Sequence, residues 1–126
     1  GVTGTSIGSP GHPAGTHVNG FDIDLAYYQA NTANNQLRPI CPYTSGGQDA
    51  SHCVAAPDKL DVWRHALFLG AVFESTRTRV VGVDGKAGPM ILSAMNTLCS
   101  SGWLSAAACN NVRAAVMRVD MSAILN

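Results

Sequence analysis

Two histidines and two aspartates lie close together near the start of the chain, in a sequence that has only four His and eight acidic residues. Residues 11–25 read GHPAGTHVNGFDIDL, with His12 and His17 in a Gly-containing loop and Asp22 and Asp24 just after it. An imidazole nitrogen and a carboxylate oxygen, with one position left open for water, are typical ligands of a catalytic zinc ion. The residue types and their spacing therefore make His17 and Asp24 candidate ligands of one metal ion.

The residues that follow this loop must hold the two aspartates in place. From residue 21 to 28 the side chains alternate in polarity, and a period of two predicts a strand with one face in the core. The apolar residues with odd numbers would face the core, and Asp22 and Asp24 would share the other face. A Gly-containing turn can fold back over such a strand, which would bring His17 near Asp24. The alternative is that Asp22 only caps the turn and that His17 is solvated.

Length and composition are those of one folded domain that covers residues 1–126. Hydrophobic residues make up 46% of the chain and charged residues 13%, which favours a packed core over disorder. The formal net charge is zero, so no basic field favours nucleic acid as a partner. The longest apolar-or-Gly run, residues 66–73, is far shorter than the ~20 residues of a membrane-spanning helix. No signal peptide is visible at Gly1, so an exported form of this chain is expected to be mature or trimmed.

Four cysteines, at positions 41, 53, 99 and 109, allow three disulfide pairings. Local pairing of Cys41 with Cys53 and of Cys99 with Cys109 would close two short loops rich in Gly, Ser, Asn and Ala. Crosslinks of that span contribute about 2–4 kcal/mol, and two of them predict a periplasmic or secreted protein. A competing interpretation makes Cys41, His52 and Cys53 zinc ligands, although the paired Cys-x-x-Cys spacing of structural zinc sites is missing.

The clearest helical pattern covers residues 58–74. Asp58 is the expected N-cap, and apolar residues recur at steps of three and four, as on the buried face of a helix. These residues are Leu60, Trp63, Leu67 and Ala71. His65 would project toward the margin of the buried face, and we interpret it as a structural histidine rather than a ligand.

Further elements are expected on both sides of this helix. The stretch 29–57 is polar and rich in Asn, Gly and Pro, which predicts a long surface loop. The later elements are an interior strand over 78–84, a helix over 89–99 begun by Pro89, and a helix over Leu104–Val119. This order predicts an α+β fold, with a small antiparallel sheet packed against helices and braced by the two local disulfides. Because two strands alone make a poor sheet, further strands are expected in the loops or beyond the ends, and the domain is expected to be incomplete at both ends.

The pattern His17-x-x-Gly20-x-Asp22-x-Asp24 resembles the zinc-binding segment of penicillin-insensitive murein endopeptidases. These enzymes belong to a wider group with the D-Ala-D-Ala metallopeptidases and the Hedgehog signalling domain. In that group a loop His and a strand Asp seven residues later bind zinc, which matches the spacing of His17 and Asp24 (24 − 17 = 7). The order of helices and strands after the motif is similar too, so the resemblance covers most of the chain as a pattern and residues 11–25 in detail.

Three features depart from the family pattern. The family's auxiliary active-site His stands three residues before the ligand His, whereas His12 stands five before His17, so His12 matches that catalytic role only loosely. The family's third ligand lies in a C-terminal His-x-His strand, and no His follows His65 in this sequence. The strand that precedes the motif in the family is also missing before Gly1. We therefore expect this chain to be an internal piece of a longer protein.

The resemblance implies a zinc-dependent peptidoglycan endopeptidase that hydrolyses cell-wall peptide crosslinks next to a D-amino acid. It implies Zn²⁺ as the cofactor, His17 and Asp24 as ligands, and a His of the missing His-x-His as the general base. Asp22 could hydrogen-bond His17 and fix its tautomer, or it could cap the turn at Gly20. Two other functions stay open: a non-catalytic wall-binding or signalling module on the same scaffold, and a disulfide-braced secreted domain without metal.

Overall fold

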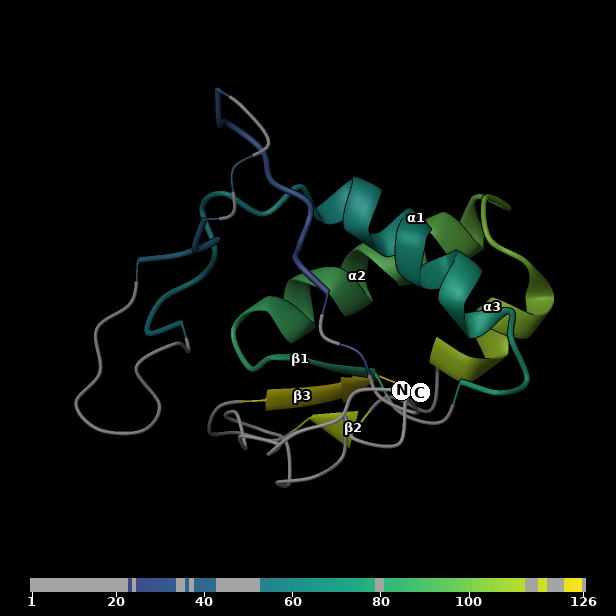
Figure 1. Ribbon diagram of the computed structural model, residues 1–126. Coiled ribbons are helices and arrows are strands. Elements are labelled where there is room, and N and C mark those ends of the chain that lie inside the picture. Colours follow the sequence, from purple (N-terminus) through teal and green to yellow (C-terminus); the bar gives the residue numbers. More distant parts are fainter. Residues whose placement is uncertain are drawn as a thin grey trace.

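In the computed structural model of the chain, the described helices lie on one side of a small set of paired strands (Figure 1). The structure describes residues 23, 25–33, 36, 38–42, 53–78 and 81–112, together with the backbone of 116–117 and 122–125. The elements are α1 (Val62–Phe73), β1 (Val81–Asp84), α2 (Ala87–Ser100), α3 (Ala106–Val112), β2 (Val116–Met117) and β3 (Ser122–Leu125). The expected mixture of helices and strands is confirmed, and so are both local disulfides.

Helix α1 begins later than the sequence pattern predicts. Its N-cap is Asp61, whose carboxylate accepts a hydrogen bond from the Arg64 N–H at 3.1 Å, and the predicted N-cap Asp58 is wrong. The cause is tertiary pairing, because Leu60 forms an isolated antiparallel bridge with Gln29. The chain is therefore held against another segment up to residue 60 and becomes helical only after it.

The buried face of α1 also differs from the predicted stripe. Trp63 and Leu67 are 51% and 43% exposed. The residues of α1 that are buried are His65, Ala66, Leu69, Gly70 and Phe73. At Gly70 a Cβ atom would collide with the side chain of Leu104, so close approach to that segment selects this face. Both faces have helical spacing, which is why periodicity alone selected the wrong one.

A tight turn joins β1 to α2. The predicted strand over 78–84 is formed over Val81–Asp84, and α2 starts at Ala87, two residues before Pro89. The Asp84 carboxylate accepts hydrogen bonds from the backbone N–H groups of Lys86 at 2.7 Å and Ala87 at 3.3 Å. An Asp-based turn, and not the proline, therefore starts the helix.

Helix α2 ends in a Schellman motif, in which the chain leaves the helix through a residue of positive φ. That residue is Gly102, with φ of 77°. Its N–H donates to Cys99 O at 3.2 Å, and the next N–H, of Trp103, donates to Leu98 O at 2.9 Å. Only glycine adopts this backbone conformation without strain, so the turn into α3 is fixed by the sequence.

The last described part of the chain forms strands. β3 pairs antiparallel with β1, from Val81 opposite Leu125 to Asp84 opposite Ser122, and β2 pairs along the other edge of β3. The predicted helix over 104–119 is therefore wrong beyond α3. Within the described strands β1 is an edge, not the interior strand that was predicted, because β-branched residues indicate a half-buried pleated surface and not a position in the sheet.

The strand predicted over 21–28 is not formed by residues 23 and 25–28, the part of that stretch that the structure describes. Ile23 is 72% and Leu25 is 56% exposed, so the alternation does not mark a buried face here. The core lies between the helices instead and extends to β1 and to the Cys41–Cys53 disulfide. Its largest fully buried side chains are Phe73, Ile91, Met95 and Val112.

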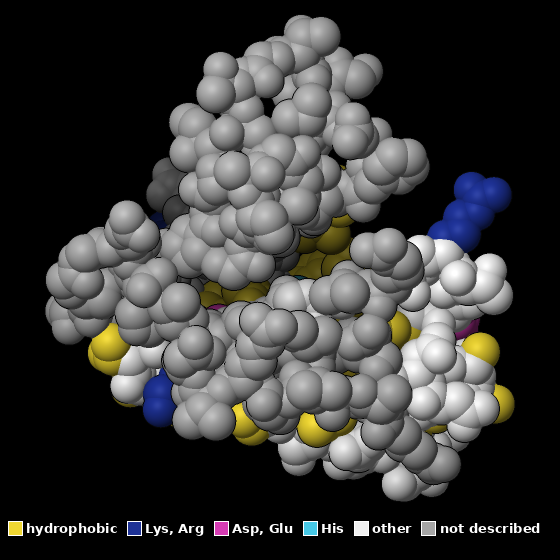
Figure 2. All heavy atoms as spheres, turned by 90° about the horizontal axis from the view of Figure 1, so that it is seen from below, with side chains coloured by type: hydrophobic (Ala, Val, Ile, Leu, Met, Phe, Trp, Pro, Cys, Tyr) yellow, Lys and Arg dark blue, Asp and Glu magenta, His cyan; other side chains and the backbone are white. Residues whose placement is uncertain are grey.

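The face of the molecule on the sheet side shows few charged side chains among the described residues (Figure 2). Seen from the sheet side, the described side chains in view are mainly hydrophobic or uncharged, and Lys and Arg side chains project singly (Figure 2). None of the described helices is both long and apolar enough to cross a membrane.

Candidate functional site

The residues predicted to do chemistry, His12, His17, Asp22 and Asp24, lie outside the described residues, and so does His52. Their grouping around a metal ion therefore stays a prediction. The structure does describe the chain that directly follows Asp24, and it shows how that chain is attached to the core.

Residues 28–30 are attached to the chain that leads into α1. Ala30 N donates to Lys59 O at 2.8 Å, and Asp61 N donates to Tyr28 O at 2.9 Å. The two hydrogen bonds flank the isolated antiparallel bridge at Gln29. A short ladder thus fixes the backbone just downstream of the predicted metal ligands.

Asp84 joins three parts of the chain. Its backbone N–H donates to the Tyr27 hydroxyl at 2.7 Å. Its Oδ2 accepts a hydrogen bond from Cys53 N at 2.8 Å, while its Oδ1 accepts those from the first residues of α2. We call Tyr27, Cys53, Asp84, Lys86 and Ala87 the Asp84 junction. Since a carboxylate accepts backbone hydrogen bonds strongly, one side chain here orders a strand end, a helix start and a loop.

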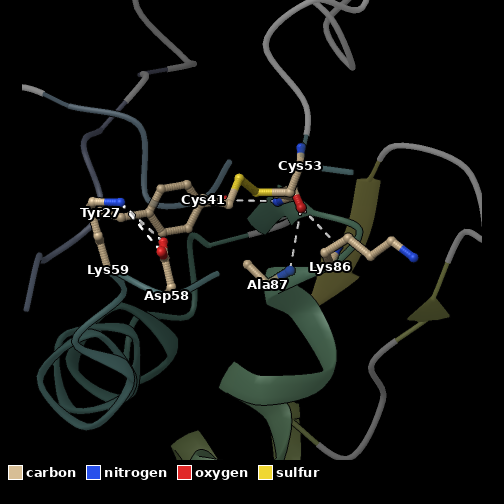
Figure 3. The surroundings of a disulfide bond; sticks show 8 residues. Tyr27, Cys41, Cys53, Asp58, Lys59, Lys86 and Ala87 are labelled. Carbon is tan, nitrogen blue, oxygen red and sulfur yellow. Dashed lines mark hydrogen bonds and ion pairs between the residues drawn. A yellow bond between two sulfur atoms is a disulfide. The ribbon is translucent and has the colours of Figure 1, made fainter. Parts of the chain in front are cut away.

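The Cys41–Cys53 disulfide lies beside this junction, near the start of α2 (Figure 3). Its Cα atoms are 5.7 Å apart, and both cysteines are buried. Because each sulfur is used in the disulfide, the alternative in which Cys41, His52 and Cys53 bind zinc is wrong.

Tyr27 contacts both the end of β1 and the aromatic ring of His65 on α1. Burial raises the pKa of Tyr27 to about 12; the nearby Asp84 carboxylate raises it further, and the hydrogen bond from the Asp84 N–H opposes the shift. The hydroxyl is therefore neutral at physiological pH, and it can donate a hydrogen bond but cannot act as a base. It borders a small cavity of about 150 Å³ that is also lined by Arg38 and the disulfide.

His65 lies in an aromatic cluster formed by Tyr27, Tyr28, His65 and Phe68. Its ring centroid is 4.9 Å from that of Tyr27 and 6.0 Å from those of Tyr28 and Phe68. The side chain is 4% exposed, so its predicted place at the margin of the buried face is wrong. Its Nδ1 has no hydrogen-bond partner among the described residues, and burial lowers the pKa of His65 to about 4. At neutral pH the ring is therefore uncharged and packs as a core residue.

Within the described ranges, no group of three or more His, Cys, Asp or Glu side chains could hold a metal ion. At the small cavity, Tyr27 and Arg38 are the lining residues whose side chains can hydrogen-bond a ligand without a metal ion.

Sequence reasoning missed the Asp84 junction. Asp84 is followed by Gly85 and precedes a helical pattern, and an Asp-Gly pair at such a place is a signal for a turn with a side-chain acceptor. That signal was available. Nothing local indicates that Tyr27, 57 residues away along the chain, accepts the hydrogen bond from its backbone.

No family model, no curated protein and no solved structure matches this chain. A functional assignment therefore depends on the residues themselves.

Proposed function

We propose that this chain is the zinc-binding part of a peptidoglycan endopeptidase, which hydrolyses cell-wall peptide crosslinks next to a D-amino acid. The observation that carries the proposal is the spacing of His17, Asp22 and Asp24 after a Gly-containing loop, which resembles penicillin-insensitive murein endopeptidases. On this proposal the helices and antiparallel strands belong to the fold of the Hedgehog and D-Ala-D-Ala-peptidase group.

The donors fit zinc in kind, because His17 offers an imidazole nitrogen and Asp24 a carboxylate oxygen. A catalytic zinc ion usually has three protein ligands, and the resemblance assigns the third to a His-x-His strand that this sequence does not contain. We therefore propose that further chain supplies that ligand and the general base. Zinc bound there supplies Lewis acidity, which polarises a carbonyl and acidifies water.

Two features of this chain would position the ligands. The carboxylate of Asp22 can accept a hydrogen bond from the second ring nitrogen of His17, which fixes the tautomer and raises the basicity of the metal-binding nitrogen. Tyr27, three residues after Asp24 in the sequence, is fixed by Asp84 and by the aromatic cluster. A metal-binding side chain that is close in sequence to a fixed residue keeps its orientation better than one in a free loop. The attachment of Tyr27 therefore supports the proposal.

The two disulfides support a location where peptidoglycan is found. Disulfides persist in the periplasm and outside the cell, and peptidoglycan lies in the same places. We therefore propose a periplasmic or secreted protein whose partner is the peptide part of peptidoglycan.

Release of soluble muropeptides from purified cell walls by the full-length protein tests this function. We expect release that stops when a chelator is added and that is lost in Asp24→Ala. The matched control is Asp58→Ala, because Asp58 is exposed and, among the residues that the structure describes, pairs with its neighbour Lys59 at 3.3 Å. Release that persists in Asp24→Ala and in the chelator contradicts the proposal, and wall binding without release indicates the non-catalytic module instead.

A further inference from the structure

The stretch 87–112, which forms α2, the following turn and α3, contains no charged residue and no His. Exposed helix faces normally carry Lys, Glu, Arg or Asp, because these side chains are soluble and favour helices. In this stretch Ser, Thr and Asn take those positions. The surface is thus neutral but still able to form hydrogen bonds.

The exposed side of α2 borders a shallow, widely open groove of about 590 Å³. Its polar lining residues are Ser93, Asn96, Thr97, Ser100 and Ser101. Hydroxyl and amide groups both donate and accept hydrogen bonds. Thr97 already donates its hydroxyl hydrogen to Ser93 O at 3.1 Å, which leaves its oxygen as an acceptor toward the groove.

Trp103 stands just beyond the last groove residues. In a Schellman motif the residue after the positive-φ glycine usually packs back on the helix, but here that residue is Trp103 and it is 72% exposed. The hydrogen bond from its N–H to Leu98 O fixes its backbone. The turn after α2 therefore presents a large apolar ring on a fixed backbone, two residues after Ser101 in the sequence.

We infer that this face, which we call the α2 surface (Ser93, Asn96, Thr97, Ser100, Ser101 and Trp103), binds an uncharged sugar chain. Sugar hydroxyl and acetamido groups match side chains that can donate and accept. The C–H face of a pyranose ring can pack on an exposed indole, whose contact with apolar groups is favourable. A nucleic acid or an acidic peptide would find no opposite charge within residues 87–112.

This inference extends the proposed function, since it assigns the glycan part of the cell wall to α2 and the peptide part to the predicted zinc site. It rests on that function only for the choice of sugar. Binding can be measured with a chelator present, so failure of the zinc site and failure of the α2 surface give different results.

The two tryptophans of the chain, Trp63 and Trp103, make a direct test possible because both are exposed. In Trp63→Phe the emission reports on Trp103 alone, and in Trp103→Phe it reports on Trp63 on α1. The probe is a hexamer of N-acetylglucosamine, titrated in the presence of a chelator. We expect a saturable fluorescence change in Trp63→Phe and none in Trp103→Phe.

Two further variants measure affinity by calorimetry. Trp103→Ala should weaken binding about tenfold, the effect expected from loss of one aromatic contact. Asn96→Lys places a charged, longer side chain in the groove at an exposed helix position and should abolish binding without unfolding α2. A glucose hexamer shows whether the acetamido groups are needed, since weaker binding of that probe assigns part of the affinity to them and equal binding assigns the site to hydroxyl groups.

Three results overturn the inference. The first is no saturable change in Trp103 emission up to the solubility limit of the N-acetylglucosamine hexamer. The second is an equal response of Trp63 and Trp103. The third is a Trp103→Ala variant with unchanged affinity but a smaller sedimentation coefficient, which assigns the surface to contacts between copies of this chain.

Discussion

The two disulfides have nearly the same span but brace very different structure. Cys41–Cys53 and Cys99–Cys109 join Cα atoms 5.7 and 5.8 Å apart, across 12 and 10 residues of sequence. Cys99–Cys109 connects α2 to α3, where helical hydrogen bonds and the Schellman motif already fix the backbone. Cys41 and Cys53 themselves lie outside the described helices and strands, and the backbone N–H of Cys53 is held by the Asp84 carboxylate.

This difference shows how chain without regular secondary structure is kept in place. Buried backbone groups must find partners, and without a ladder or helix they use a side chain and a crosslink. Stability around Cys41–Cys53 should therefore be concentrated in a few contacts, whereas around Cys99–Cys109 it should be spread over many.

Removal of each disulfide tests this contrast most strongly. We expect Cys41→Ala with Cys53→Ala to lower the free energy of unfolding by about 3–5 kcal/mol, and Cys99→Ala with Cys109→Ala by about 2–3 kcal/mol. The loop-closure contribution is similar for the two, but the first pair also positions the Cys53 N–H on Asp84. Urea unfolding followed by circular dichroism measures both. An equal or reversed order would show that the Asp84 junction holds the loop without the crosslink.

Replacement of Asp84 addresses the same contrast through a side chain. Asp84→Ala leaves three backbone N–H groups without their acceptor, and we expect it to cost about 2–3 kcal/mol of unfolding free energy. Asp58→Ala is the control and should change stability by less than about 0.5 kcal/mol, as most exposed positions do. A loss for Asp84→Ala that is no larger than for the control would contradict the role given to this carboxylate.

The third and smallest expected change in unfolding free energy comes from His65 in the aromatic cluster, and it depends on pH. Burial holds the pKa of His65 at about 4, below the unfolded value of 6.5, so the unfolded chain takes up the proton first as the pH falls. The stabilisation from neutral His65 is therefore complete above pH 6.5 and is lost as the pH falls toward 4.

Between pH 7 and pH 5 the protein should lose about 1–2 kcal/mol more unfolding free energy than His65→Phe, which keeps a ring but cannot titrate. The comparison with the variant removes the contributions of the other histidines and of the carboxylates. Unfolding free energies that change in parallel with pH for the two proteins would show that His65 is not buried as a neutral ring.

Part of the fold could be predicted because its signals are local. Val81 and Val83 mark a strand, and the apolar spacing after Gly88 marks α2. Local pairing of the cysteines was predictable because the intervening stretches are short and rich in small residues. These features depend on residues that are close in sequence, where propensity and periodicity apply.

The parts that failed depend on distant contacts. Asp61 displaced Asp58 as N-cap because Leu60 is bridged to Gln29, and the inner face of α1 was chosen by the contact between Gly70 and Leu104. The helical spacing through Val116 gave way to strand pairing with β3. Of the candidate site, residue types and spacing predict the ligands, but their geometry depends on how the loop folds back, which spacing does not determine.

Metal content is the most direct test of the central claim that His17 and Asp24 bind one zinc ion. Purified full-length protein and its Asp24→Ala variant would be dialysed and analysed for zinc by mass spectrometry, with Asp58→Ala as the control. We predict stoichiometric zinc in the wild type and in the control, and none in Asp24→Ala. Zinc that is absent from the wild type, or retained in full by Asp24→Ala, would contradict the account.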